Sequence, residues 1–61
     1  MFRIYALDTA TNTFRALDLA RNLFVRRLRN ASIFAEEIAE NVIENLRASN
    51  PNVEFELRRC S

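Results

Sequence analysis

The chain has 61 residues, 49% of them hydrophobic and 28% charged, and its formal net charge is +1. This size permits one domain, residues 1–61, and the composition is globular rather than disordered. A single cysteine excludes an intrachain disulfide, and without histidine the chain cannot build a usual zinc site, so we expect no metal and no cofactor. No apolar run approaches the ~18 residues of a membrane span, and residues 1–5 lack the pattern of a signal peptide. We therefore expect a cytoplasmic, reducing location and no membrane partner.

Five residue types are absent, namely Gly, Lys, His, Gln and Trp, so all nine basic residues are Arg. Without Gly, any position with positive φ must fall on Asn, and phosphate-binding glycine loops are excluded. The unusual composition leaves three origins open: a GC-rich genome, a mobile element or phage, and human design.

Residues 1–7 alternate between two faces and predict a strand, with Phe2 and Ile4 on one side and Arg3 and Tyr5 on the other. The turn-forming cluster 8–13 follows. Thr11 or Thr13 would cap a helix beginning there.

The apolar residues of 14–29 fall on one wide arc of a helical wheel, opposite a polar strip that contains Arg15, Arg26 and Arg29. This pattern predicts a first helix. Residues 33–48 predict a second helix, capped by Asn30 or Ser32 and ended at Pro51.

Residues 53–58 alternate strictly and predict a second strand. The fold class is therefore α+β with the order β-α-α-β and no internal repeats. A helical hairpin packs on a small antiparallel sheet, and Arg3 and Tyr5 share a face with Glu54 and Glu56. Because two strands make a marginal sheet with two open edges, we expect dimerisation to extend it.

The inventory of side chains argues against an enzyme, because there is no His to act as a base and Cys60 has no activating partner. Charge is segregated instead: residues 1–31 hold six Arg and two Asp, giving +4, and residues 32–61 hold three Arg and six Glu, giving −3. The basic stripe Arg15, Arg26 and Arg29 is read either as a binding site or as a solvated face.

The second predicted helix stacks Glu36, Glu40 and Glu44 at intervals of four residues, where like charges destabilise an isolated helix. We expect Arg21 or Arg27, or an Arg of a partner, to compensate them. These charged helix faces favour a small, non-enzymatic, accessory or inhibitor-like module that binds a protein partner and forms a homodimer. No small-molecule substrate is expected.

Two alternatives stay open. Residues 30–38, Asn-Ala-Ser-Ile-Phe-Ala-Glu-Glu-Ile, are similar to the turn and second helix of ribbon-helix-helix repressors, over a resemblance that covers residues 2–46. The resemblance implies a nucleic-acid-binding dimer in which paired N-terminal strands, with Arg3 and Tyr5, enter the major groove. The inter-helix turn lacks that family's usual Gly, and Leu7 is apolar where a base-reading residue is expected. The other alternative is a designed mini-domain without a ligand.

Overall fold

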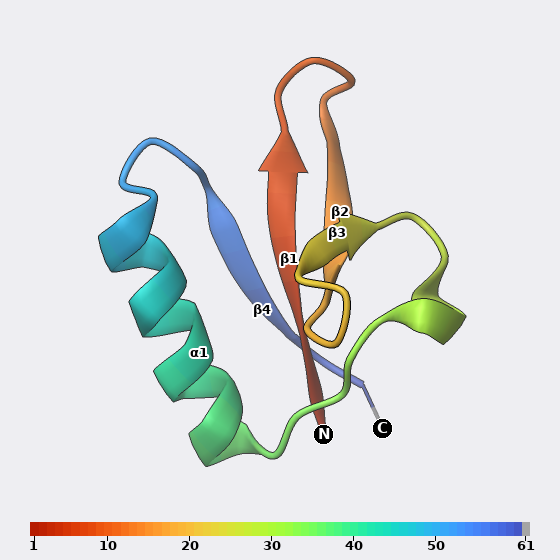
Figure 1. Ribbon diagram of the computed structural model, residues 1–61, viewed down its shortest axis with the longest axis vertical. Helices are drawn as coiled ribbons and strands as arrows, with labels where there is room; N and C mark the ends of the chain where they lie inside the picture. The colour runs from red at the N-terminus through yellow and green to blue at the C-terminus, as the bar shows by residue number, and fades with distance from the viewer. Residues whose placement is uncertain (61) are drawn as a thin grey trace.

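The computed structural model describes residues 1–60, which form one helix packed against a four-stranded sheet (Figure 1). The α+β class predicted from the sequence is confirmed. The elements in chain order are β1 (Phe2–Asp8), β2 (Thr13–Asp18), β3 (Leu23–Val25), the 3-10 turn η1 (Leu28–Asn30), α1 (Glu36–Ser49) and β4 (Phe55–Arg59).

The strand order is β3-β2-β1-β4, and each neighbouring pair is antiparallel. The first and last strands pair as predicted, with Tyr5 opposite Glu56. Tyr5 also lies opposite Ala16 of β2, so β1 is hydrogen-bonded along both of its edges. A second copy therefore cannot pair with β1, as the ribbon-helix-helix alternative requires.

The predicted helix over residues 14–29 is wrong, because β2, β3 and the start of the next turn occupy this segment. The motif Ala-Leu-Asp-x-Ala-x-Asn-x-Phe occurs at residues 6–14 and again at residues 16–24, which corrects the expectation of no repeats. Each occurrence of the motif forms the end of one strand, a loop and the start of the next strand. Two similar hairpins therefore stand where one helix was expected.

The chemistry of these loops explains why the strands turn. Asn12 and Asn22 occupy the same position in each motif and have φ values of 54° and 56°, which confirms that positive φ falls on Asn in a chain without Gly. Asp8 Oδ1 accepts a hydrogen bond from the Ala10 amide at 3.0 Å, and Asp18 Oδ1 accepts one from the Arg21 amide at 3.3 Å. Such Asp-to-backbone bonds offer the chain an alternative to helix.

The Thr hydroxyls at the first loop do not cap a helix. Thr11 and Thr13 bond one another, with 2.7 Å between their oxygens. The predicted cap for the second helix is wrong as well, because α1 begins at Glu36 with Ala35 as its N-cap. Its end at Ser49 agrees with the sequence, and the amide and side chain of Asn50 both donate to Leu46 O.

Ser32 instead belongs to a segment that joins the sheet to α1. Its amide donates to Leu17 O, and its hydroxyl accepts from the Leu19 amide at 2.8 Å. Phe34 exchanges two backbone hydrogen bonds with Phe2, each 2.8 Å long. Residues 32–34 are thus fixed to both β1 and the end of β2.

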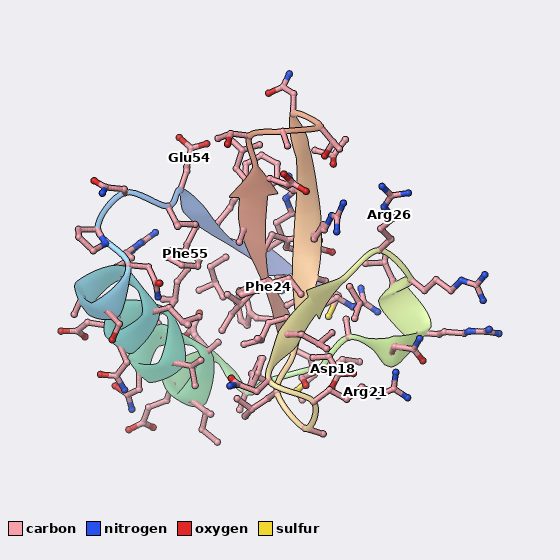
Figure 2. All side chains as sticks on the ribbon, turned by 45° about the horizontal axis from the view of Figure 1, so that its top comes forward. Asp18, Arg21, Phe24, Arg26, Glu54 and Phe55 are labelled. Carbon is pink, nitrogen blue, oxygen red and sulfur yellow. The ribbon has the colours of Figure 1, made fainter. Side chains whose placement is uncertain are left out.

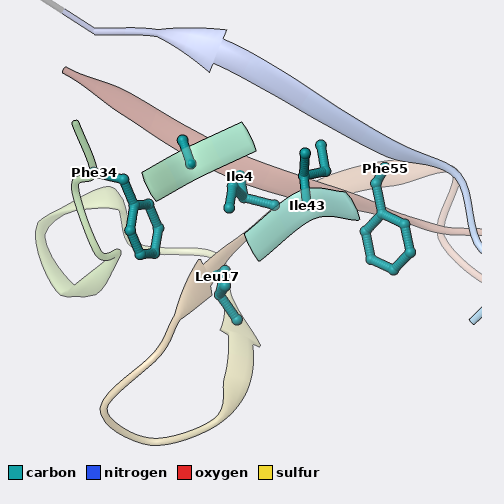
Figure 3. Packing of buried hydrophobic residues seen from close by; sticks show 6 residues of the cluster. Ile4, Leu17, Phe34, Ile43 and Phe55 are labelled. Carbon is teal, nitrogen blue, oxygen red and sulfur yellow. The ribbon is translucent and has the colours of Figure 1, made fainter. Parts of the chain in front are cut away.

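The core lies between α1 and the inner face of the sheet (Figure 3). Its buried members are Ile4, Leu17, Phe34, Ala39, Ile43 and Phe55. Phe24 of β3 and Phe55 of β4 lie on opposite edges of the sheet, yet their ring centroids are only 6.2 Å apart. Three strand spacings would separate these edges by about 14 Å in a flat sheet. The sheet therefore curls around the core, and α1 packs against β1 and β4.

Candidate binding surfaces

The basic stripe predicted for a first helix does not exist, because its three Arg residues lie in different places. Arg15 is in β2, where Nη2 lies 3.0 Å from Asp8 Oδ2. Arg26 and Arg29 remain close in the chain: Arg26 lies two residues before η1, and Arg29 is the second residue of η1. The structure thus separates Arg15 from the other two and neutralises it locally.

Exposed Arg residues gather instead around η1, beyond the β3 edge of the sheet, whereas α1 lies beside the β4 edge (Figures 1 and 2). We call Arg26, Arg27 and Arg29 the basic turn. Within residues 1–60, none of the three lies within 4.0 Å of a carboxylate. Arg21 is nearby in the chain, but its Nε lies 3.6 Å from Oδ2 of the buried Asp18. The basic turn therefore carries three positive charges that this part of the chain leaves unpaired.

The helix carries the opposite charge. We call its exposed glutamates the acidic face: Glu36, Glu37, Glu40 and Glu44. The side chains that anchor α1 in the core, Ala39 and Ile43, lie on the stripe of the helix that borders these glutamates. Glu36 and Glu37 lie in the first turn, where the helix dipole favours negative charge.

The expected compensation by Arg21 or Arg27 is wrong, because none of the acidic-face carboxylates forms an ion pair among the described residues. Arg47, the basic residue of the last turn, donates instead to Phe55 O at 3.4 Å. Repulsion between glutamates four residues apart costs roughly 0.2–0.5 kcal/mol per pair in an isolated helix. No arginine among residues 1–60 forms an ion pair with these glutamates that would offset the repulsion between them.

The outer face of the sheet, which points away from α1, is organised around Arg58. Its guanidinium carbon lies 4.5 Å from the ring centre of Tyr5 and 4.9 Å from that of Phe14. Its Nε donates to Glu56 Oε1 at 2.8 Å, and its Nη2 donates to Glu56 Oε2 at 3.3 Å. The register sets Arg3 opposite Arg58 rather than opposite a glutamate, which corrects the expected pairing.

This pair shifts the ionisation of both of its members. Hydrogen bonding to Arg58 lowers the pKa of Glu56, and the charge of Arg58 acts in the same direction. The hydrogen bond to Glu56 raises the pKa of Arg58, with a further contribution from the charge of Glu56. Both side chains are about half exposed, so solvent screens much of their attraction.

Arg58 also decides what the outer face can bind. Tyr5 is only 8% exposed, although α1, the α-helix of residues 1–60, packs on the other face of the sheet. Proteins that stack nucleic-acid bases on a sheet need free aromatic faces. Here the guanidinium of Arg58 already occupies a position over Tyr5 and Phe14. Tyr5, proposed from the sequence as a contact residue, is thus largely withdrawn from solvent.

The sequence did not identify this Arg58 cluster, although it contained the signal. The alternation of residues 53–58 places Glu56 and Arg58 on one face, and the predicted pairing of the two strands adds Tyr5. The sequence conceals the contribution of Phe14, because residues 14–29 also fit the periodicity of a helix. Within residues 1–60, no pocket opens on the surface and no cluster of potential metal ligands occurs. No helix of this region is long and apolar enough to cross a membrane.

No protein-family model, curated protein or solved structure matches the chain. The basic turn, the acidic face and the outer face of the sheet are the features of the molecule that bear on its function.

Proposed function

We propose that the protein is a small, non-enzymatic protein-binding module whose acidic face binds a basic protein surface, and that it also associates with itself. An accessory or inhibitor-like role suits a domain of this size. The observation that carries the proposal is the acidic face: Glu36, Glu40 and Glu44 are exposed, stacked and unpaired among the described residues. A partner that supplied positive charge would relieve the repulsion that the chain itself leaves in place.

The position of the acidic face also supports this function. The glutamates project from a helix that is anchored in the core through Ala39 and Ile43, so the carboxylates are held on a rigid element. Charges fixed in this way steer an oppositely charged partner and align it as it docks. Such a surface requires neither a cleft nor a cofactor.

The test compares capture of protein partners by the wild type, by Glu36→Gln/Glu40→Gln/Glu44→Gln, and by Glu36→Asp/Glu40→Asp/Glu44→Asp. The Gln variant keeps the size of the side chains but removes three charges, whereas the Asp variant keeps the charges. We expect the Gln variant to lose most of the captured protein and the Asp variant to retain it. Equal capture by the Gln variant and the wild type, with circular dichroism unchanged, would refute the role of the acidic face.

A second candidate is nucleic-acid binding, and the basic turn is the observation that favours it. The segment from Leu19 to Ala35 contains four Arg and no acidic residue. Phosphate binding through these side chains would weaken steeply as salt rises, by about one power of salt concentration for each phosphate neutralised. Titration of duplex DNA into the wild type and into Arg26→Gln/Arg27→Gln/Arg29→Gln tests this candidate. It fails if the wild type does not bind at low salt.

A further inference from the structure

We propose that the acidic face of one copy binds the basic turn of a second copy, so that the protein associates head to tail. This inference rests on the proposed function of the acidic face and names one partner for it. Arg suits such a contact because its planar guanidinium can hold a carboxylate through two parallel hydrogen bonds.

The two surfaces match in charge and are both available. The basic turn contributes three Arg that form no ion pair among residues 1–60, and the acidic face contributes four Glu in the same condition. Outside these two surfaces, Arg15–Asp8, Arg21–Asp18 and Arg58–Glu56 form ion pairs, whereas Arg3, Arg59 and Glu54 form none among residues 1–60. The basic turn and the acidic face differ from these single charges because each brings several unpaired charges of one sign together in one short segment, and the two signs are opposite.

One copy cannot bring these two surfaces together. In Figure 1 α1 lies at the left, beside the edge strand β4, and the basic turn lies at the right, beyond the other edge strand, β3. The connecting residues are held in place, because Ser32 is hydrogen-bonded to Leu17 O and to the Leu19 amide, and Phe34 is bonded to Phe2. The basic turn therefore cannot fold back onto α1 without breaking these bonds.

The position of the surfaces also determines the geometry of association. In a head-to-tail contact two different surfaces meet, so each pair of copies keeps one unused basic turn and one unused acidic face. Further copies can add to these ends. The wild type should therefore grow beyond two copies as its concentration rises, whereas a closed twofold dimer would stop at two.

Salt should oppose this association strongly. The charges are exposed, and raising the ionic strength from about 0.01 M to about 1 M shortens the screening length from about 30 Å to about 3 Å. An association driven by exposed apolar side chains such as Ile33 and Ile38 would persist at high salt.

The experiment is sedimentation velocity of the full chain and of two neutralised variants. The first variant, Glu36→Gln/Glu40→Gln/Glu44→Gln, keeps the basic turn and leaves Glu37 as the one charge of the acidic face. The second, Arg26→Gln/Arg27→Gln/Arg29→Gln, keeps only the acidic face. At low salt we expect the wild type to exceed the mass of two copies and each variant alone to remain at the 7.1 kDa of one copy. An equimolar mixture of the variants should form pairs and stop at two.

The inference is overturned if the wild type remains at one copy over the accessible concentrations at low salt. It is also overturned if the wild type saturates at two copies, or if either variant associates as the wild type does. Failure here is separable from failure of the proposed function. A protein that stays single but loses its captured partner on neutralisation of the acidic face would refute self-association and leave the binding of a basic protein surface standing.

Discussion

Asn22 offers a sharp test of the second hairpin, because the hairpin and the helix expected from the sequence predict opposite effects at this residue. Its φ of 56° lies in the left-handed region. The left-handed conformation costs most residues with a Cβ atom about 1–2 kcal/mol; it costs Asn less and Gly almost nothing. Asn22→Ala should therefore destabilise the protein by about 1 kcal/mol, and Asn22→Gly should be neutral or stabilising.

A change of 1 kcal/mol shifts the melting temperature of a domain of this size by about 4–8 °C, which thermal denaturation followed by circular dichroism resolves easily. In a helix the order would reverse, since Ala is more favourable than Gly by about 1 kcal/mol. Asn45 provides the matched control because it is exposed within α1. We expect Ala to be more stable than Gly at position 45 and less stable than Gly at position 22. If Asn22→Ala melts above Asn22→Gly, residues 19–22 do not form this turn.

Three further predictions concern the core and the outer face of the sheet. Phe34→Ala should cost about 3–5 kcal/mol by removing a buried ring; a domain of this length has only about 3–9 kcal/mol in total, so urea denaturation should show a variant close to unfolding. Because Arg58 lowers the pKa of Glu56 in the folded state, the stabilisation from this pair should be complete above the ordinary glutamate pKa and lost as pH falls through the lowered value. Urea denaturation at pH 7 and at pH 3 should therefore show a smaller loss of stability for Glu56→Gln than for the wild type, and an equal loss would contradict the pair. Arg58→Ala should uncover the ring of Tyr5, the only tyrosine, and increase the quenching of its fluorescence by acrylamide, whereas Arg59→Ala should leave quenching unchanged.

Periodicity predicted three elements of this fold correctly. Strict alternation identified β1 and β4, and the apolar face of residues 33–48 identified α1, whose core positions include Ala39 and Ile43. Pro51 and Asn50 marked the end of the helix. These segments each carry one clear pattern, so local sequence was sufficient.

Residues 14–29 failed because they satisfy two patterns at once. Alternation in β2 places Leu17 in the core, yet the same apolar residues also fill a helical arc. With no Gly or Pro to mark the loop, the turn depends on Asn22 and Asp18, whose role appears only when residues 6–14 and 16–24 are compared. Repetition of a turn motif was the signal that would have decided between helix and hairpin.

The candidate surfaces were predicted only in part. Charge segregation along the chain was visible, and the acidic face lies on the helix where it was expected. The basic stripe depends on a helix that does not form: helical periodicity places Arg15 beside Arg26 and Arg29, whereas in the structure Arg15 pairs with Asp8. Which charges remain unpaired depends on contacts between distant segments, which periodicity alone does not predict.

The most direct test of the charged binding surfaces is a dilution series followed by two-dimensional amide NMR at low salt. We expect concentration-dependent shifts at residues 36–44 of α1 and at residues 26–29 of the basic turn, with both sets vanishing at high salt. Shifts confined to the outer face of the sheet around Tyr5 and Arg58, or no shifts at either charged surface, would contradict this proposal.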